Sequence, residues 1–243
     1  PFGLGHMGIT AENVAKDYNV TRADMDAFAL TSQTRAANAI EKGYFKDQIT
    51  PVKITKKREE FAFDTDEHVR GETTADGLAS LRPAFDKEGQ VTAGNSSGIN
   101  DGAAALILGN AEKVEKSNKS PLAKIISYGF GGVAPRIMGM GPVPASKMAL
   151  ERAGLKVSQI DIVESNEAFA AQACAVSKEL SLPSDIVNPN GGAIALGHPV
   201  GATGAIIMTK LIYELHRTGG RYGLATMCIG GGQGIAVIID TQV

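Results

Sequence analysis

Apolar side chains recur at helical spacing through the first 43 residues. In the stretch "TRADMDAFALTSQTRAANAIEKG" (21–43), one helical face gathers small and apolar residues, namely Met25, Phe28, Ala29, Ser32, Ala36, Ala39 and Ile40. Thr21 and Asp24 form a capping box of the acidic kind, and Gly43 stands where a helix of this length ends. This pattern predicts helices within residues 9–41, the first of them beginning near Thr10.

The pattern changes between residues 50 and 90. "PVKITKK" indicates a strand, and the charged text after it carries turn signals at Arg82-Pro83 and Glu88-Gly89. We therefore expect residues 1–99 to form an irregular α/β region that covers a site like a lid.

Beyond residue 100 the chain alternates between strand-like and helix-like segments. Predicted strands fall at 103–109, 122–131, 160–166, near Ile186, at 223–229 and at 234–240, and predicted helices at 110–118, 144–155, 167–180 and 201–217. Such alternation is typical of a covered parallel or mixed sheet, so the predicted fold class is α/β with layered helices.

Two of these helices have distinct faces. In 167–180 the predicted core stripe is Phe169, Ala173, Val176 and Leu180, with Cys174 packed beside it. In 201–217 the sequence separates two faces, an apolar one of Ile207, Met208, Leu211, Ile212 and Leu215 and a polar one of Lys210, Glu214 and Arg217.

Composition narrows the class of protein. With 243 residues, 43% hydrophobic and 21% charged, the chain is long enough for one or two domains. A net charge of −2 offers nothing to attract nucleic acid, and no apolar run approaches the length needed to cross a bilayer. The two cysteines have no pairing pattern, and "PFGLGHMGIT" lacks the features of a secretory signal, so we expect a soluble, cytoplasmic protein whose given start is a cut end.

Common cofactor motifs find no match. No GxxxxGK[ST] occurs, and neither "GFGGVAP" nor "GMGPVP" is a dinucleotide-binding loop. The four histidines, His6, His68, His198 and His216, are scattered, so no metal site is predicted, and His68 and His216 are expected at the surface.

Three side chains stand out as candidate chemistry. His198 lies in "ALGHPVGATG" ahead of a helix start, where bare backbone lets a ligand come close. Cys228 ends a strand before three glycines and is either a buried hydrophobe or a reactive thiol. Asn166 follows the strand at 160–166 and either caps the next helix or holds substrate or water.

The chain resembles the thiolases in three segments, which are "NEAFAAQ" (166–172), "NPNGGAIALGHPVGATGA" (188–205) and "CIGGGQGIA" (228–236). The surrounding text looks most like the acetyl-CoA acetyltransferases of that family, over essentially all 243 residues. The resemblance implies the thiolase fold, in which two βαβαβαββ halves form αβαβα layers and a loop domain is inserted in the first half. By similarity, 1–99 corresponds to the loop domain that binds coenzyme A, 100–120 to the end of the N-terminal half, and 121–243 to the C-terminal domain, with the N-terminal half largely missing.

The same resemblance implies a reversible Claisen condensation of two acetyl-CoA molecules to acetoacetyl-CoA and CoA, with these thioesters as substrates and no further cofactor. Cys228 is then the acid/base, His198 donates to the enolate oxygen, Asn166 holds a water in the same oxyanion hole, and the backbone N–H of Gly230 serves a second hole. Coenzyme A contacts are implied for Ser97, Arg70, Ala93, His6, Met7, Met138 and Phe169. A small acyl group, a place in fatty acid metabolism and a homodimer or homotetramer are likewise expected.

One departure from the family is clear. Thiolases place the acyl-carrying cysteine in the N-terminal half, and neither Cys174 nor Cys228 occupies its motif. We therefore expect a C-terminal portion of a thiolase that is inactive alone and that leaves apolar surface of 121–243 exposed or paired with another chain. The alternatives are a non-catalytic coenzyme A or lipid carrier of this fold and a ketosynthase-like acyltransferase. Ketosynthases use two histidines and one cysteine, and Cys228 at the second histidine position favours a thiolase.

Overall fold

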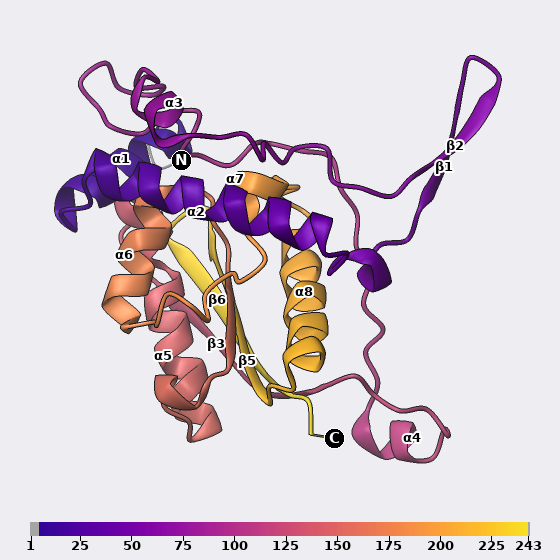
Figure 1. The fold of residues 1–243 in the computed structure, drawn as a ribbon. Helices are drawn as coiled ribbons and strands as arrows, with labels where there is room; N and C mark the ends of the chain where they lie inside the picture. Colours follow the sequence, from indigo (N-terminus) through magenta and orange to yellow (C-terminus); the bar gives the residue numbers. More distant parts are fainter. Residues whose placement is uncertain (1–4, 243) are drawn as a thin grey trace.

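The computed structural model describes residues 5–242, which form a layered α/β unit with an irregular helical region across one end (Figure 1). The first part of the chain contains the helices α1 (Met7–Asp17), α2 (Arg22–Glu41), α3 (Ala75–Ala79) and α4 (Ala111–Glu115), the short 3-10 helix η1 (Lys46–Gln48) and the strands β1 (Val52–Lys56) and β2 (Glu59–Phe63). The layered unit contains β3 (Lys124–Gly132), η2 (Pro135–Met140), α5 (Pro142–Ala153), η3 (Val157–Gln159), β4 (Ile162–Ser165), α6 (Ala170–Leu180), α7 (Ala193–Leu196), α8 (Thr203–Thr218), β5 (Tyr222–Ile229) and β6 (Gln233–Asp240).

The main sheet has the strand order β3-β6-β5-β4. Strands β4 and β5 are parallel and the other pairs are antiparallel, so the predicted mixed sheet is confirmed. The prediction of a strand near Ile186 is wrong, because only an isolated parallel bridge between Val187 and Val163 forms there.

Helices cover the sheet from both sides (Figure 1). On one side α5 and α6 pack against Val163, Leu224, Ala236 and Ile238. On the other side the apolar face predicted for α8 packs, through Ile207, Leu211 and Leu215, against Ile162, Ala225 and Ile239. Strands β4 and β5 and the end of β6 thus bury alternate residues against opposite layers, as expected where a sheet is covered on both faces.

The polar face predicted for α8 does not face solvent. Lys210 and Glu214 are both buried, because each lies against carboxylate, amide or carbonyl groups brought in from elsewhere in the chain. Only Arg217, at the end of that face, is exposed.

The first part of the chain packs across one end of the layered unit. The capping box of Thr21 and Asp24 is confirmed at the start of α2, and α2 contacts both α6 and α7. The hairpin of β1 and β2 projects away from the rest of the molecule (Figure 1).

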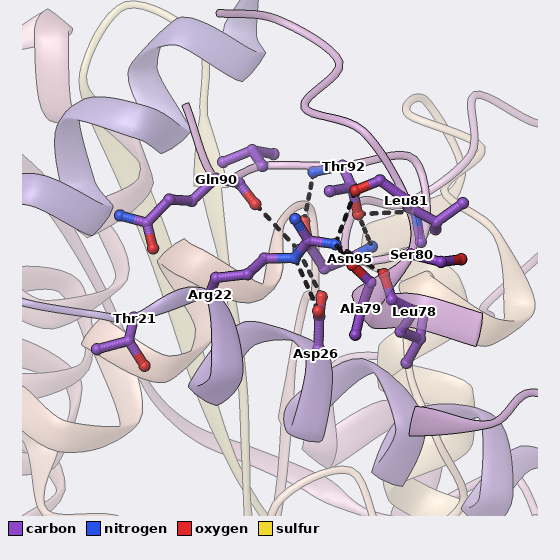
Figure 2. A network of polar contacts seen from close by, with 12 residues as sticks. Thr21, Arg22, Asp26, Leu78, Ala79, Ser80, Leu81, Gln90, Thr92 and Asn95 are labelled. Atoms are coloured by element: carbon purple, nitrogen blue, oxygen red, sulfur yellow. Dashed lines mark hydrogen bonds and ion pairs between the residues drawn. The ribbon is translucent and has the colours of Figure 1, made fainter. Parts of the chain in front are cut away.

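A polar network ties residues 78–96 to α2 (Figure 2). Arg22 pairs with Asp26 at 2.7 Å and donates to the carbonyls of Leu78 and Leu81, while the amide of Asn95 donates to the other oxygen of Asp26 at 2.9 Å. This network fixes the turn that carries Ser97, one of the residues implied for coenzyme A.

Apolar side chains remain exposed on β3 and β6, as predicted for 121–243. Tyr128 and Phe130 are 57% and 58% exposed, and Ile235, the cross-strand partner of Phe130, is 38% exposed. The strand predicted at 103–109 is wrong: this segment has no regular secondary structure and Ile107 and Leu108 are exposed, because no strand within residues 5–242 supplies it with ladder hydrogen bonds.

No helix in the described part of the chain combines the length and apolar character that a membrane span requires.

Candidate active site

The amide of Asn166 and the imidazole of His198 lie together at one end of the sheet. Asn166 directly follows β4, where its backbone N–H donates to the Thr226 carbonyl of β5 at 3.0 Å. Its side-chain Nδ2 lies 3.4 Å from Nε2 of His198. The helix that follows begins only at Ala170 with Phe169 as its N-cap, so Asn166 is not a helix cap and its buried side chain is available to the site.

Gly197 lets the chain present His198 at this position. Its φ is +95°, and a Cβ there would lie 2.6 Å from the side chain of Asn100. Asn100 Oδ1 accepts the backbone N–H of His198 at 3.1 Å, and Ile99 forms a parallel bridge with His198. A side chain at 197 would therefore strain the backbone and displace Asn100.

The contact with Thr203 favours one tautomer of His198. The Oγ1 of Thr203 lies 2.7 Å from His198 Nδ1 and 2.9 Å from the Pro199 carbonyl. That carbonyl already accepts the backbone N–H groups of Ala202 and Thr203, so the single hydroxyl proton is best used towards Nδ1. The proton of the neutral ring is then on Nε2, the nitrogen that faces Asn166.

Burial lowers the pKa of His198, which keeps the imidazole neutral at pH 7. The side-chain oxygen of Asn166 is buried and receives no hydrogen bond from residues 5–242. With the amide turned by 180°, that oxygen accepts Nε2–H and Nδ2 is left free to donate. Nδ2 is then free to donate to an oxygen that gains negative charge, and Nε2–H of His198 can do the same once it leaves the Asn166 oxygen.

Cys228 lies at the same end of the sheet. It is buried near the end of β5, two residues beyond Thr226, and packs with Met138, Ala168 and Phe169. Burial raises the pKa of its thiol to about 11, so the group is protonated at pH 7. The loop after it turns through Gly231 and Gly232, which have φ values of +88° and +92°, and the exposed Gly230 has no atom within 4 Å of where a Cβ would stand.

Several residues implied for coenzyme A also converge here. The hydroxyl of Ser97 donates to the Ala168 carbonyl at 3.0 Å, which places it beside the Cys228 cluster. The ring of His6 stacks on Phe85 at 4.7 Å between centroids, and Phe85 meets Phe169 edge-on at 5.8 Å. Sequence reasoning missed Phe85; its only local signal is an isolated aromatic residue in a turn-rich passage.

Other implied contacts are less closely tied to this cluster. Met7 begins α1 beside His6 and is 38% exposed. Ala93 is exposed on the turn that Asn95 stabilises. Arg70 is exposed, and its backbone N–H donates to the Gln33 side chain at 2.8 Å, on the α2 side of the molecule.

His68, His216 and Cys174 lie at the surface or in packing contacts and not in the candidate site. His216 is exposed and contacts the Leu122 carbonyl, as expected of a surface residue. The prediction for His68 is wrong: its Nδ1 contacts the Ala195 carbonyl at 2.8 Å and the residue is half-buried, because it packs under α7. Cys174 is half-buried beside the Asp24 carbonyl, and burial raises its pKa to about 12, which suits packing rather than chemistry. Within residues 5–242 no three His, Cys, Asp or Glu side chains are grouped so as to hold a metal ion.

Comparison with known protein families matches nearly the whole chain. The thiolase N-terminal domain model matches residues 2–112, and the thiolase C-terminal domain model matches residues 119–241. The chain belongs to the thiolase family. The family prediction made from the three sequence segments is thereby confirmed.

Relatives and solved structures of this family are similar throughout the chain. β-Ketothiolase BktB of Cupriavidus necator is 58% identical over 99% of this chain and 61% of its own length, and the acetyl-CoA acetyltransferase of Escherichia coli is 55% identical over 97% and 60%. The crystal structure of Bacillus anthracis acetyl-CoA acetyltransferase superposes with a TM-score of 0.95 at 50% identity, covering 98% of this chain and 61% of that one. Human mitochondrial 3-ketoacyl-CoA thiolase in complex with CoA gives a TM-score of 0.90 at 46% identity, over 97% and 59%. The fold is therefore the thiolase fold, and this thiolase chain spans about 60% of the length of its relatives.

Proposed function

We propose that this thiolase acts as an acetyl-CoA C-acetyltransferase, joining two acetyl-CoA molecules to acetoacetyl-CoA and CoA and catalysing the reverse reaction. The observation that carries the proposal is the meeting of Asn166 and His198, 3.4 Å apart, at the end of the sheet where Cys228 is buried. These residue types supply two N–H donors and one acid/base, which is what enolate chemistry on a thioester requires.

In the condensation, Cys228 first acts as an acid. The thiolate of an acyl-carrying cysteine, which the family places in its N-terminal half, attacks one acetyl-CoA; the bond from the acetyl carbon to the CoA sulfur breaks, and that sulfur takes the proton of Cys228. Because burial raises the pKa of Cys228 to about 11, the thiol holds its proton until CoA leaves, and its thiolate is then a strong base.

The thiolate of Cys228 next removes an α-proton from the second acetyl-CoA. The electron pair left on carbon is delocalised to the thioester oxygen, which accepts Nε2–H of His198 and a water held by Asn166. The enolate carbon attacks the acyl carbonyl, whose oxygen is stabilised by the Gly230 N–H, and the acyl-carrying sulfur leaves. Residues 1–99 cover the coenzyme A site in this proposal, and the close packing of Met138 and Phe169 around Cys228 favours an acetyl group.

Thiolysis of acetoacetyl-CoA by the protein as its gene encodes it tests these roles. Cys228→Ser is expected to lower kcat by about 10²–10⁴-fold and His198→Ala by about 10²–10³-fold. Cys174→Ser and His216→Ala are the matched controls and should retain full turnover. Unchanged turnover in both site variants would favour the non-catalytic carrier, whereas condensation with an acyl group on a carrier protein would favour the ketosynthase-like alternative.

We further propose that residues 1–243 alone form no acyl-enzyme, because neither cysteine occupies the acyl-carrying position of the family. Intact-mass spectrometry after incubation with acetoacetyl-CoA should show no acetyl adduct on this chain, and an adduct on Cys174 or Cys228 would refute the assignment. A homodimer or homotetramer in the cytoplasm, serving fatty acid metabolism, is proposed for the protein as the cell makes it; light scattering after gel filtration measures its assembly.

A further inference from the structure

Lys210 is buried although it carries a charge. The residue is 6% exposed, and its Nζ donates to Glu164 Oε2 at 2.7 Å and to the Gly191 carbonyl at 2.6 Å. Glu164 is 1% exposed, so both charges of this pair have left water. A lysine is almost never buried without such partners.

The two partners of Lys210 lead to the two halves of the candidate catalytic pair. Glu164 lies in β4, two residues before Asn166. Gly191 begins the segment that continues through α7 to His198. One ammonium group on α8 therefore contacts both the strand that carries the amide and the segment that carries the imidazole.

Gly191, whose carbonyl Lys210 binds, has a backbone conformation that few other residues can adopt. Gly191 has a φ of +74°, and a Cβ there would lie 2.6 Å from the Ser32 carbonyl of α2. Lys210 of α8 binds the carbonyl of the same residue, so the start of the segment is in contact with two helices.

The rest of the segment is held by a second acid. Glu167 Oε2 accepts the Ser32 hydroxyl at 2.6 Å and the Ile194 backbone N–H at 3.2 Å, while its Oε1 accepts the Asn188 amide at 2.8 Å. Asn188 in turn bonds both backbone groups of Ser165. These contacts hold the segment to β4 and α2. Its contacts with α8 come from Lys210 at Gly191, from Glu214, which accepts from Asn190 at 2.7 Å just before the segment, and from Thr203, which lies 2.7 Å from the ring of His198 at its end.

Stability does not explain why an ion pair occupies this place. The desolvation of two buried charges offsets most of their attraction, and apolar replacements of buried pairs are often neutral or stabilising. The Lys210–Gly191 contact, in contrast, sets a position: it fixes where the His198 segment begins relative to β4.

We propose that Lys210 is a positioning residue that sets the distance between His198 and Asn166 by holding the Gly191 carbonyl. The proposal rests on the function proposed above for this pair. The contact with Gly191 sets the geometry, and Glu164 keeps the ammonium in place.

Two variants separate this role from charge neutralisation. Lys210→Met removes the ammonium at similar volume and leaves the Glu164 carboxyl unpaired. The double variant Lys210→Met/Glu164→Gln also removes that charge, so it regains thermal stability and covers the case in which the single variant fails to fold. Lys147→Met, on an exposed position of α5, is the control.

The measurements are thiolysis kinetics and amide hydrogen exchange of the protein as its gene encodes it. Both Lys210 variants should lose on the order of 10–100-fold in kcat, with KM for CoA within about twofold, because the donors of the site are displaced. Exchange should rise in peptides covering 189–198 and stay unchanged in β5 and β6. Recovery of kcat in the double variant, or exchange that rises uniformly, would overturn the proposal. The exchange result does not depend on activity, so it still tests Lys210 if His198→Ala shows that the proposed function is wrong.

Discussion

The chemistry of His198 depends on a single hydroxyl proton. Thr203 Oγ1 lies 2.7 Å from Nδ1, and only the tautomer protonated on Nε2 can donate towards Asn166 or a substrate oxygen. Replacing Thr203 by Val keeps the shape of the side chain and removes the donor. We expect the Nδ1-protonated tautomer to become populated and kcat to fall by about tenfold or more, since removing one oxyanion donor entirely costs about 10²–10³-fold.

The ¹⁵N resonances of the His198 ring measure this tautomer directly. Thr203→Ser retains a hydroxyl at the same atom and is the matched control, with the wild-type tautomer expected. An unchanged ring spectrum in Thr203→Val would show that another group fixes the proton.

At the scale of secondary structure, α5 packs on bare backbone of β3. A Cβ on Gly129 would lie 2.2 Å from the Ala145 carbonyl and 2.7 Å from the Ala149 nitrogen, both main-chain atoms of α5. Gly129→Ala must therefore push the helix away from the sheet, and we expect a loss of about 1–3 kcal/mol in the free energy of unfolding.

Gly132 provides the comparison for that substitution. It lies in the same strand, and the nearest atom to its added Cβ is 3.9 Å away. In urea unfolding followed by circular dichroism, Gly132→Ala should stay within about 0.5 kcal/mol of wild type. Equal losses at the two positions would mean that strand propensity, and not the approach of α5, controls the effect.

Local sequence patterns predicted most helices and strands, but they did not predict which other elements each one packs or pairs with. The helices around Met25 and Leu211 and the strands that end near Asn166 and Cys228 follow from periodicity and caps, because those signals lie within each element. The segment 103–109 has the composition of a strand and is none, because strand formation needs a partner that its own residues cannot specify.

At the scale of the whole molecule, local signals likewise marked the site residues but not their partners from distant parts of the sequence. Glycine-rich surroundings marked His198 and Cys228, and the position after a strand marked Asn166. The burial of Lys210 could not be predicted, because its partner Glu164 lies 46 positions away and helical periodicity alone assigns a lysine to solvent. Phe85 was missed for a related reason: its stacking on His6 joins two turns that are distant in the sequence.

The buried acid behind the site makes the stability of the whole molecule depend on pH. Burial raises the pKa of Glu164 from 4.5 to about 7, although Lys210 acts in the opposite direction. A raised folded-state pKa means that the folded protein binds a proton more tightly than the unfolded chain, so this contribution is complete below pH 4.5 and is lost as pH rises through about 7. The free energy of unfolding of wild type, taken relative to Glu164→Gln, should therefore fall by about 3 kcal/mol across that window. Burial also raises the pKa of Glu167, a group that both proteins share and whose charge acts on Glu164. Urea titrations of the two proteins at several pH values measure the difference, and a flat or rising curve would show that Glu164 stays ionised beside Lys210 throughout.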